Sequence, residues 1–304
     1  MLKLKPSPFL IHANLDAEAR WAGGALPQSV AVRVSHYAAL VSALAPDDAE
    51  VLVWAPAAID AARILLPVTM HVGAPPRADL AWASAGAKAA NDRRFAVALA
   101  AELGVGIVGA RTIVSADEIE IAGRWVTKAP WTSAGRDRCH GEGPPNAEHQ
   151  ARIRRLIAKF GALVLEPWLE RTLDLGVCAM VGPDGTVTAE APHGLVTDAR
   201  GTFLGIDLAP PALDERARVQ LDSFVAAAGH RLAATGYTGP IAVDAFVAGG
   251  RLCVCEINAR YSFGWIARAL HRRFGTTRLG FTTPPTGARL LVAPGEDGVV
   301  AWAQ

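Results

Sequence analysis

Two carboxylates and one amide stand at alternating positions of a predicted hairpin in the C-terminal part of the chain. The runs Ile241–Val247 and Arg251–Ile257 are joined by an Ala-Gly-Gly turn, a pattern typical of a β-hairpin. Because side chains alternate between the faces of a strand, Asp244 is predicted to lie near Glu256 and Asn258. Acidic groups are rarely buried without a partner, and Mg²⁺ is typically held by carboxylates plus phosphate oxygens. The hairpin therefore predicts a magnesium site that also receives phosphate groups.

The neighbours of these residues extend the prediction. The same alternation places Leu252 and Val254 on the strand face that carries Glu256. Arg260 follows where the chain leaves the strand, and its guanidinium could bind a phosphate or a carboxylate, or pair with a neighbouring acid. The alternative for the acidic face is an ordinary solvated sheet face. The coincidence of three ligand-type side chains favours the metal site.

A lysine upstream stands in a second pattern with chemical meaning. Lys128 lies near the end of the predicted strand Arg124–Ala129, before a long polar loop, 130–146, which contains Thr132-Ser133-Ala134-Gly135-Arg136. Loops of this length inside a compact domain are usually functional or mobile. A lysine on a rigid strand beside the backbone N–H groups of such a loop can neutralise nucleotide phosphates. The alternative is an ordinary lysine at the end of a strand.

A third segment, Leu163–Val177, runs from an apolar strand into Glu166-Pro167-Trp168-Leu169. An extended segment of this kind can present backbone groups to the edge of an adenine ring. Asp174 follows shortly after, and its carboxylate could accept hydrogen bonds from ribose hydroxyls. Glu166 could instead cap a turn before Pro167.

Together these segments resemble the ATP-grasp superfamily, which includes D-alanine–D-alanine ligase, biotin carboxylase and glutathione synthetase. The resemblance rests on the order of the segments and covers roughly residues 88–275. The segments are Val126-Thr127-Lys128-Ala129-Pro130, Leu163–Val177, Gly239–Asp244 and Cys255-Glu256-Ile257-Asn258-Ala259-Arg260. Each is a weak signal alone, whereas Glu-x-Asn-x-Arg after an acidic strand is fairly specific in this order.

The resemblance implies how a nucleotide would bind. ATP would lie between two α+β subdomains, with Lys128 on its phosphates. The adenine hinge would be formed, largely through backbone groups, by Glu166, Trp168 and Leu169. Asp174 would bind the ribose, although a glutamate is commoner at that place.

The resemblance also implies a metal and a reaction. Asp244, Glu256 and Asn258 would hold Mg²⁺, with Mn²⁺ as an alternative, and Lys128 and Arg260 would be the catalytic cations. Family members form an acyl phosphate from a carboxylate and ATP, and Arg260 would stabilise that developing group. An amine or another nucleophile then displaces the phosphate. The implied function is a carboxylate–amine or carboxylate–thiol ligase that releases ADP and phosphate.

The sequence departs from the family pattern at two places. The earlier phosphate-contacting lysine of many members is replaced by Arg93 or Arg94, and the loop after Lys128 has one central glycine where many members have several. These departures leave open a nucleotide-binding regulatory subunit without ligase chemistry. A third hypothesis is a carboxylase-type member that activates bicarbonate. The role of His193, on a predicted loop, also stays open.

The remaining pattern predicts an α/β chain with the ATP-grasp architecture. Ser29–Ser35 and Glu50–Ala55 are predicted strands, and Ser35–Leu44 and Ala57–Leu66 are predicted helices. Strands that alternate with helices indicate a small α/β domain with a parallel sheet. We expect three parts: an N-terminal pre-ATP-grasp domain over residues 1–87, a small ATP-grasp subdomain over 88–165 and a large subdomain over 166–304.

The composition is that of a globular protein, with 51% hydrophobic and 19% charged residues. Because the net charge is only +1 and the basic residues are scattered, we expect neither a nucleic-acid nor a membrane partner. Four cysteines without zinc-ligand spacing indicate a reducing compartment, so we expect a cytoplasmic protein. The partners left are a small-molecule carboxylate and an amine or peptide substrate. A homodimer stays open, because many relatives dimerise.

Overall fold

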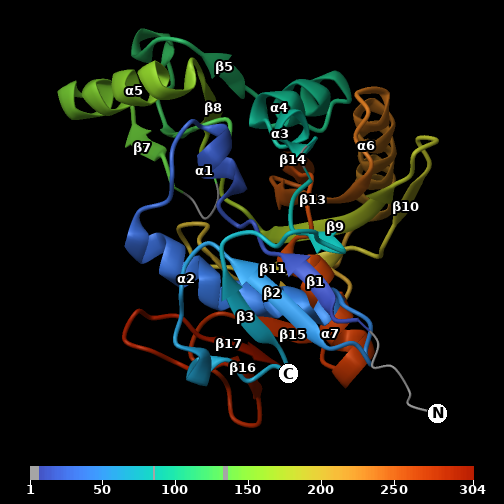
Figure 1. The fold of residues 1–304 in the computed structure, drawn as a ribbon. Coiled ribbons are helices and arrows are strands. Elements are labelled where there is room, and N and C mark those ends of the chain that lie inside the picture. Colours follow the sequence, from blue (N-terminus) through green and yellow to red (C-terminus); the bar gives the residue numbers. More distant parts are fainter. Residues whose placement is uncertain (1–6, 85, 133–135) are drawn as a thin grey trace, which may run out of the picture.

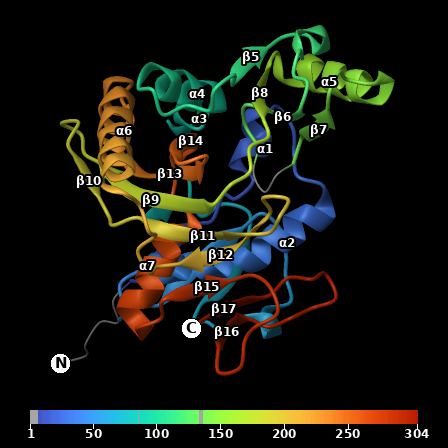
Figure 2. The same cartoon turned by 180° about the vertical axis from the view of Figure 1, so that it is seen from behind.

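The computed structural model describes residues 7–84, 86–132 and 136–304 as a mixed α/β protein. In this part of the chain the strands form three sheets (Figure 1). Both views place the small sheet and its helix α5 (Ala147–Phe160) at one end of the molecule, and the C-terminal strands at the other (Figure 2). The predicted mixture of α/β and α+β architecture is confirmed.

The N-terminal sheet has the order β3-β2-β1-β4, and every neighbouring pair is parallel. The parallel sheet predicted for this region is therefore present. Helices and a 3₁₀ segment connect its strands. The elements are β1 (Phe9–His12), α1 (Ala17–Trp21), α2 (Gln28–Ala38), the 3₁₀ segment Ala39–Leu44, β2 (Val51–Ala55), β3 (Thr69–Val72) and β4 (Leu80–Ala81).

Two predicted elements in this region are wrong. Ser29–Ser35 lies inside helix α2, which buries Ala31 and Ser35, four positions apart, as one helical face requires. Over so short a run the alternating valines also fit the two-residue period of a strand. The burial of one helical face shows that the helical period applies. Of the helix predicted over Ala57–Leu66, only the 3₁₀ turn Ala61–Arg63 forms.

The small sheet is antiparallel, with the order β5-β8-β6-β7. Helix α5 covers one of its faces, where Ile153 and Phe160 pack with Trp125 and Cys139. Because side chains alternate along each strand, Lys128 projects from the opposite face. The elements that lead into and form this sheet are α3 (Ala87–Ala90), α4 (Arg93–Glu102), β5 (Arg111–Ile113), β6 (Arg124–Lys128), β7 (Arg138–Glu142) and β8 (Leu163–Pro167).

The large sheet has nine strands among the described residues, in the order β14-β13-β9-β11-β12-β15-β17-β16, with β10 beside β9. The predicted hairpin forms its β13–β14 edge. The strands are β9 (Leu173–Val181), β10 (Val187–Ala189), β11 (His193–Thr197), β12 (Phe203–Asp207), β13 (Gly239–Ala248), β14 (Arg251–Asn258), β15 (Arg278–Gly280), β16 (Arg289–Val292) and β17 (Ala301–Ala303), and the helices are α6 (Glu215–Ala234) and α7 (Phe263–Phe274).

The two helices of this part cover opposite faces of β9 and β13. Leu221 of α6 lies in the hydrophobic core with Val177, whereas Trp265 of α7 packs against Cys178 on the other face. Asp244 lies on the face of Cys178, because its cross-strand partner on β9 is two positions from that cysteine. The acidic residues therefore share a sheet face with the start of α7.

Two further findings concern membrane-spanning helices and the state of the cysteines. No helix in the described ranges is long and apolar enough to cross a membrane. The four cysteines are all free, and Cys178 and Cys255 have thiol pKa values that burial raises to about 12. These thiols are therefore protonated at neutral pH and poor nucleophiles.

The packing of α6 gives a test of the fold. Leu221 has no exposed surface, so Leu221→Ala is expected to lower the free energy of unfolding by about 2–5 kcal/mol, because it removes buried methyl groups and leaves a cavity. Urea denaturation measures the change. Val219→Ala on the same helix is the matched control: Val219 is 54% exposed, so its truncation should change stability by less than about 0.5 kcal/mol. Equal losses would contradict the buried face of α6.

Candidate nucleotide and metal site

The three predicted metal ligands meet on one face of the large sheet. Asp244 on β13 is the cross-strand partner of Glu256 on β14. Asn258 Nδ2 donates a hydrogen bond of 3.0 Å to Asp244 Oδ2. The predicted hairpin thus brings the three side chains together, although their role as ligands stays a prediction.

A β-bulge changes the predicted face of the neighbouring residues. The register shifts directly after Asp244. As a result Leu252 and Val254 join the main core, while Cys253 takes the side of the sheet that carries Glu256. The prediction that Leu252 and Val254 share the face of Glu256 is wrong, because a bulge adds one residue to one strand and shifts its alternation.

The pKa values of the two carboxylates in the site shift in opposite directions. Burial, and after it the charge of Glu256, raises the pKa of Asp244 to about 7. Burial also disfavours the charged form of Glu256, but the charges of Arg93 and Arg260 outweigh it and hold the pKa of Glu256 below its usual value. A divalent cation between the two would favour both charged forms.

The donor set fits an open magnesium site rather than a closed metal cage. Across residues 7–84, 86–132 and 136–304, no group of three or more His, Cys, Asp or Glu side chains is placed to hold a metal ion. The site instead offers two carboxylates and the Asn258 amide oxygen. Mg²⁺ usually keeps positions for water and phosphate oxygens, so this incomplete set suits a metal bound together with a nucleotide.

Arg93, rather than Arg94, enters the site. The Arg93 side chain is 5% exposed, and its Nη2 lies 3.1 Å from Glu256 Oε2. Its Nη1 donates to the Ala129 carbonyl at 2.7 Å and to Thr132 Oγ1 at 2.9 Å. One guanidinium therefore joins the large sheet to the loop after β6. Arg94 instead pairs with the aspartate that caps α4.

Lys128 and Glu166 form a buried ion pair on adjacent strands of the small sheet. Lys128 Nζ lies 2.5 Å from Glu166 Oε2, and the side chains are 8% and 2% exposed. Glu166 Oε1 has no hydrogen-bond partner in the described part of the chain. The hinge role predicted for Glu166 used its backbone, and the side chain has this separate task of fixing the lysine. A nucleotide phosphate can bind the fixed ammonium only if Lys128 donates to the phosphate and to Glu166 at the same time.

The predicted adenine hinge follows β8. The Trp168 N–H donates to the Arg124 carbonyl at 2.8 Å, so it is already used within the sheet. The Leu169 N–H makes no hydrogen bond with any described residue, while its side chain packs against the apolar cluster that contains Phe246. A free N–H next to paired backbone is the kind of donor that a ligand satisfies. Of the three predicted hinge residues, Leu169 is therefore the one with an open backbone donor.

Asp174, the predicted ribose acid, lies on β9 and already has two protein partners. Its Oδ1 accepts a hydrogen bond of 3.0 Å from Arg171 Nη1, and its Oδ2 accepts one of 2.8 Å from Thr197 Oγ1. A ribose would have to use the remaining lone pairs of this carboxylate. The role of Asp174 stays a prediction.

Arg260 lies beside the metal triad and is held from the N-terminal part of the chain. Its Nη1 donates to Glu18 Oε1 at 2.6 Å and to Asn91 Oδ1 at 2.8 Å, and its Nη2 donates to Asn258 Oδ1. Glu18 belongs to α1 and its side chain is 8% exposed. The predicted catalytic arginine thus has its charge balanced by an acid far away in sequence.

Three residues of the site were not predicted: Glu18, Asn91 and Arg138. Glu18 and Asn91 reach the site only because α1 and α3 pack beside the end of β14. Arg138 is the cross-strand partner of Lys128 on β7. The long loop between these strands hides their register from the sequence, so no local signal identifies Arg138.

His193 lies under the start of α7, and its ring is buried. A Cβ added at Gly176 would lie 2.8 Å from His193 Nε2, and one at Gly264 would lie 2.7 Å from it, so both glycines make room for the ring. Burial, and after it the charge of Arg268, lowers the pKa of His193 to about 3. No hydrogen bond joins His193 to a described residue of the triad, so its role stays open.

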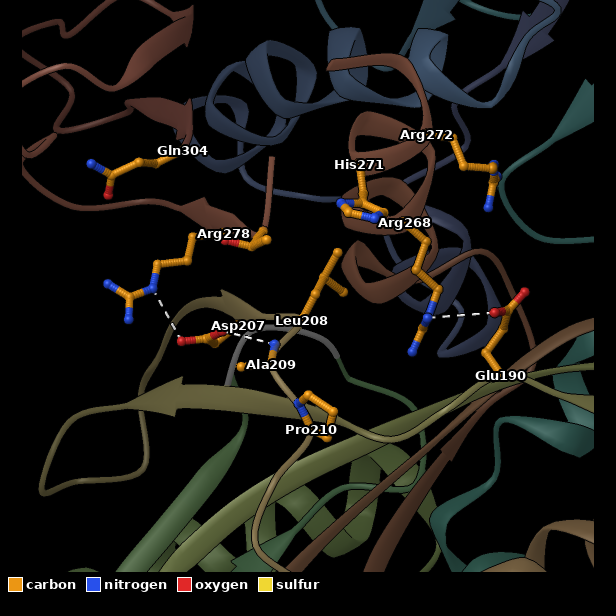
Figure 3. A pocket seen from close by; sticks show the side chains of 11 residues that line it. Glu190, Asp207, Leu208, Ala209, Pro210, Arg268, His271, Arg272, Arg278 and Gln304 are labelled. Carbon is orange, nitrogen blue, oxygen red and sulfur yellow. Dashed lines mark hydrogen bonds and ion pairs between the residues drawn. The ribbon is translucent and has the colours of Figure 1, made fainter. Parts of the chain in front are cut away.

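A cavity of about 860 Å³ lies apart from these residues, between α7, β15 and the segment after β12 (Figure 3). Two ion pairs line it, Arg278–Asp207 at 3.1 Å and Arg268–Glu190 at 3.4 Å. None of the residues predicted for the nucleotide or the metal lines this cavity. The predicted site is therefore defined by its side chains and is separate from this cavity.

Comparison with solved structures identifies the fold. N5-carboxyaminoimidazole synthetase from Staphylococcus aureus matches with a TM-score of 0.61 and 10% identity, over 99% of this chain and 94% of that one. Phosphoribosylamine–glycine ligase from Thermotoga maritima matches with a TM-score of 0.60 and 13% identity, over 98% and 90%. Both are ATP-grasp enzymes. This chain has the ATP-grasp fold.

The biotin carboxylase domain of 2-oxoglutarate carboxylase from Hydrogenobacter thermophilus matches with a TM-score of 0.50 and 16% identity. The match covers 70% of this chain, which spans 61% of that ATP-grasp domain. At these low identities the likeness concerns the fold. No protein-family model and no curated protein matches the sequence.

The Arg93–Glu256 pair gives a test of the site geometry. Arg93→Met is expected to lower the free energy of unfolding by about 3 kcal/mol, because it leaves the Glu256 charge without its closest partner. Urea unfolding in metal-free buffer measures the change. Arg93→Met combined with Glu256→Gln should recover the part of the loss that comes from the unpaired Glu256 charge, but not the part that comes from the lost bonds to Ala129 and Thr132. Arg94→Met is the control, since it breaks a more exposed pair and should cost less than about 1 kcal/mol. Equal losses for the two single variants would contradict the buried pair.

Proposed function

We propose that the chain is an ATP-dependent ligase that activates a carboxylate as an acyl phosphate and joins it to an amine or another nucleophile, with release of ADP and phosphate. The contacts of Arg93 carry the proposal. They connect Glu256 of the acidic triad to Thr132, in the loop that follows Lys128. The acidic face of the large sheet therefore lies beside the loop that follows Lys128, which supports a nucleotide bound between the two sheets.

The comparisons support ATP and magnesium as the ligands. The Hydrogenobacter thermophilus domain was crystallised with MgADP, ADP and bicarbonate, and another neighbour of the same fold is the ADP complex of N5-carboxyaminoimidazole ribonucleotide synthetase. In this chain Asp244, Glu256 and Asn258 would hold the magnesium ion. Mn²⁺ is expected to replace it, as the same oxygen ligands suit both ions.

The reaction would divide between the residues of the two sheets. The substrate carboxylate attacks the terminal phosphorus of ATP, which forms an acyl phosphate and releases ADP, and the nucleophile then attacks the acyl carbon and releases phosphate. Lys128 would hold the phosphates in line, and Arg260 would offset the charge on the acyl phosphate. Bound magnesium would supply further positive charge to the transferring group.

Around this chemistry the remaining predicted residues would hold the nucleoside. Leu169 would donate its free N–H to the adenine edge, with Glu166 and Trp168 shaping the hinge, and Asp174 would bind the ribose. We also propose the three parts 1–87, 88–165 and 166–304, a cytoplasmic location and small-molecule substrates. A homodimer stays an open option.

Nucleotide binding is the first test of this proposal. Isothermal titration calorimetry should show binding of a non-hydrolysable ATP analogue that requires Mg²⁺, and Glu256→Gln should weaken it at least about 10-fold, because one metal ligand loses its charge. Glu120→Gln is the matched control, since Glu120 is exposed and far from β14 in the chain. Absence of binding, or binding that ignores both Mg²⁺ and Glu256, would contradict the site.

The products of ATP turnover then distinguish the three candidate functions. A ligase should release ADP and phosphate only when the right carboxylate and nucleophile are both present, whereas AMP and pyrophosphate would count against it. ADP release that depends on bicarbonate would identify the carboxylase alternative, which the bicarbonate in the neighbour's crystal makes worth including. Tight magnesium-dependent binding without turnover over a broad set of acids and amines would favour a regulatory subunit.

A further inference from the structure

A further cation faces the proposed nucleotide site from β7. Arg138 is the first residue of β7 and the cross-strand partner of Lys128. Directly opposite residues of an antiparallel pair share one sheet face. The next residue, Cys139, packs on the other face with Trp125, under α5. Arg138 therefore projects from the inner face of the small sheet, on the side of Lys128.

The other cations of the site already have acid partners, whereas Arg138 has none among the described residues. The Arg138 side chain makes no hydrogen bond and no ion pair with any described residue. It is partly buried, and its nitrogens are not sealed off from solvent. The ion pairs of the other cations are Lys128–Glu166 at 2.5 Å, Arg93–Glu256 at 3.1 Å and Arg260–Glu18 at 2.6 Å.

This unpaired guanidinium is costly in the ligand-free protein. Burial lowers the pKa of Arg138, and the attraction of Glu256 only partly offsets burial and the repulsion from Arg93. The pKa of an arginine is so high that the side chain keeps its charge at neutral pH in spite of this shift. A partly buried cation without a counterion is best explained by an anion that arrives from solution.

We infer that Arg138 binds the terminal phosphates of ATP. The inference rests on the proposed nucleotide site and adds a ligand that comes from β7. The terminal phosphates are the expected partners because the groups that influence Arg138 most are Glu256 and Arg93, at the magnesium end of the site. The planar fork of the guanidinium matches two phosphate oxygens at once.

A purely structural Arg138 would behave differently from a nucleotide ligand. A structural residue stabilises the free protein, and its loss would weaken all nucleotides alike. A cation kept for phosphate leaves the free protein no more stable than a neutral side chain would, because it is close to Arg93 and has no partner of its own. The two roles therefore differ in the stability of the free protein and in the dependence of binding on the number of phosphates.

The test uses calorimetry with Mg²⁺ and three probes: a non-hydrolysable ATP analogue, ADP and AMP. Arg138→Gln should weaken the ATP analogue by about 10-fold or more, ADP by less, and AMP by less than about 2-fold. Arg138→Lys should restore part of the lost affinity. The melting temperature of ligand-free Arg138→Gln should equal or exceed that of the wild type. Arg155→Gln, exposed on α5, makes the same charge change on the same subdomain and should leave all affinities unchanged.

The outcomes distinguish this inference from the proposed function. A wild-type chain that binds no nucleotide would overturn both. A wild type that binds the ATP analogue with magnesium, together with Arg138→Gln of unchanged affinity, would overturn only the role of Arg138. Equal weakening of the ATP analogue, ADP and AMP, or a lower melting temperature of the ligand-free variant, would identify Arg138 as a structural residue and overturn the inference.

Discussion

The proximity of the two acids on the β13–β14 hairpin is the constraint on which the rest of the site depends. Asp244 and Glu256 face each other across neighbouring strands, and their negative charges repel where little water screens them. In the ligand-free chain Arg93 pairs with Glu256 and so offsets part of this repulsion. Because Arg93 also bonds the loop after β6, the electrostatics of the large sheet help to position the small one.

Three of the four cations of the site are paired with carboxylates, and Arg138 is the exception among the described residues. Each of Lys128, Arg93 and Arg260 is matched by one carboxylate, so these three cations add little net charge to the site. A magnesium nucleotide brings both a dication and several negative oxygens, and each existing pair can share its charge with one of these without a large change in position. These three pairs are therefore preorganised, and Arg138 is left as the cation that attracts an anion.

The sequence could predict the features that depend on local pattern, but not those that depend on tertiary contacts. The hairpin joins Asp244, Glu256 and Asn258 over a short turn, so alternation was enough to bring them together. The ATP-grasp fold followed from the order of such segments. Glu18 could not be predicted, because it reaches Arg260 through packing of parts that lie far apart in the chain. The strand predicted over Ser29–Ser35 failed because burial of one helical face, which alternation does not reveal, decides its structure.

The bulge after Asp244 lets one strand serve two environments. Before the bulge, Leu252 and Val254 of β14 point into the main core. After it, Glu256 and Asn258 point toward the site on the opposite face. Deleting a single residue between these pairs would restore regular alternation and turn one pair to the wrong side of the sheet. Substitutions within β14 can be absorbed one by one, but a change in its length by one residue cannot, so homologues with this site should keep the spacing from Leu252 to Asn258 invariant.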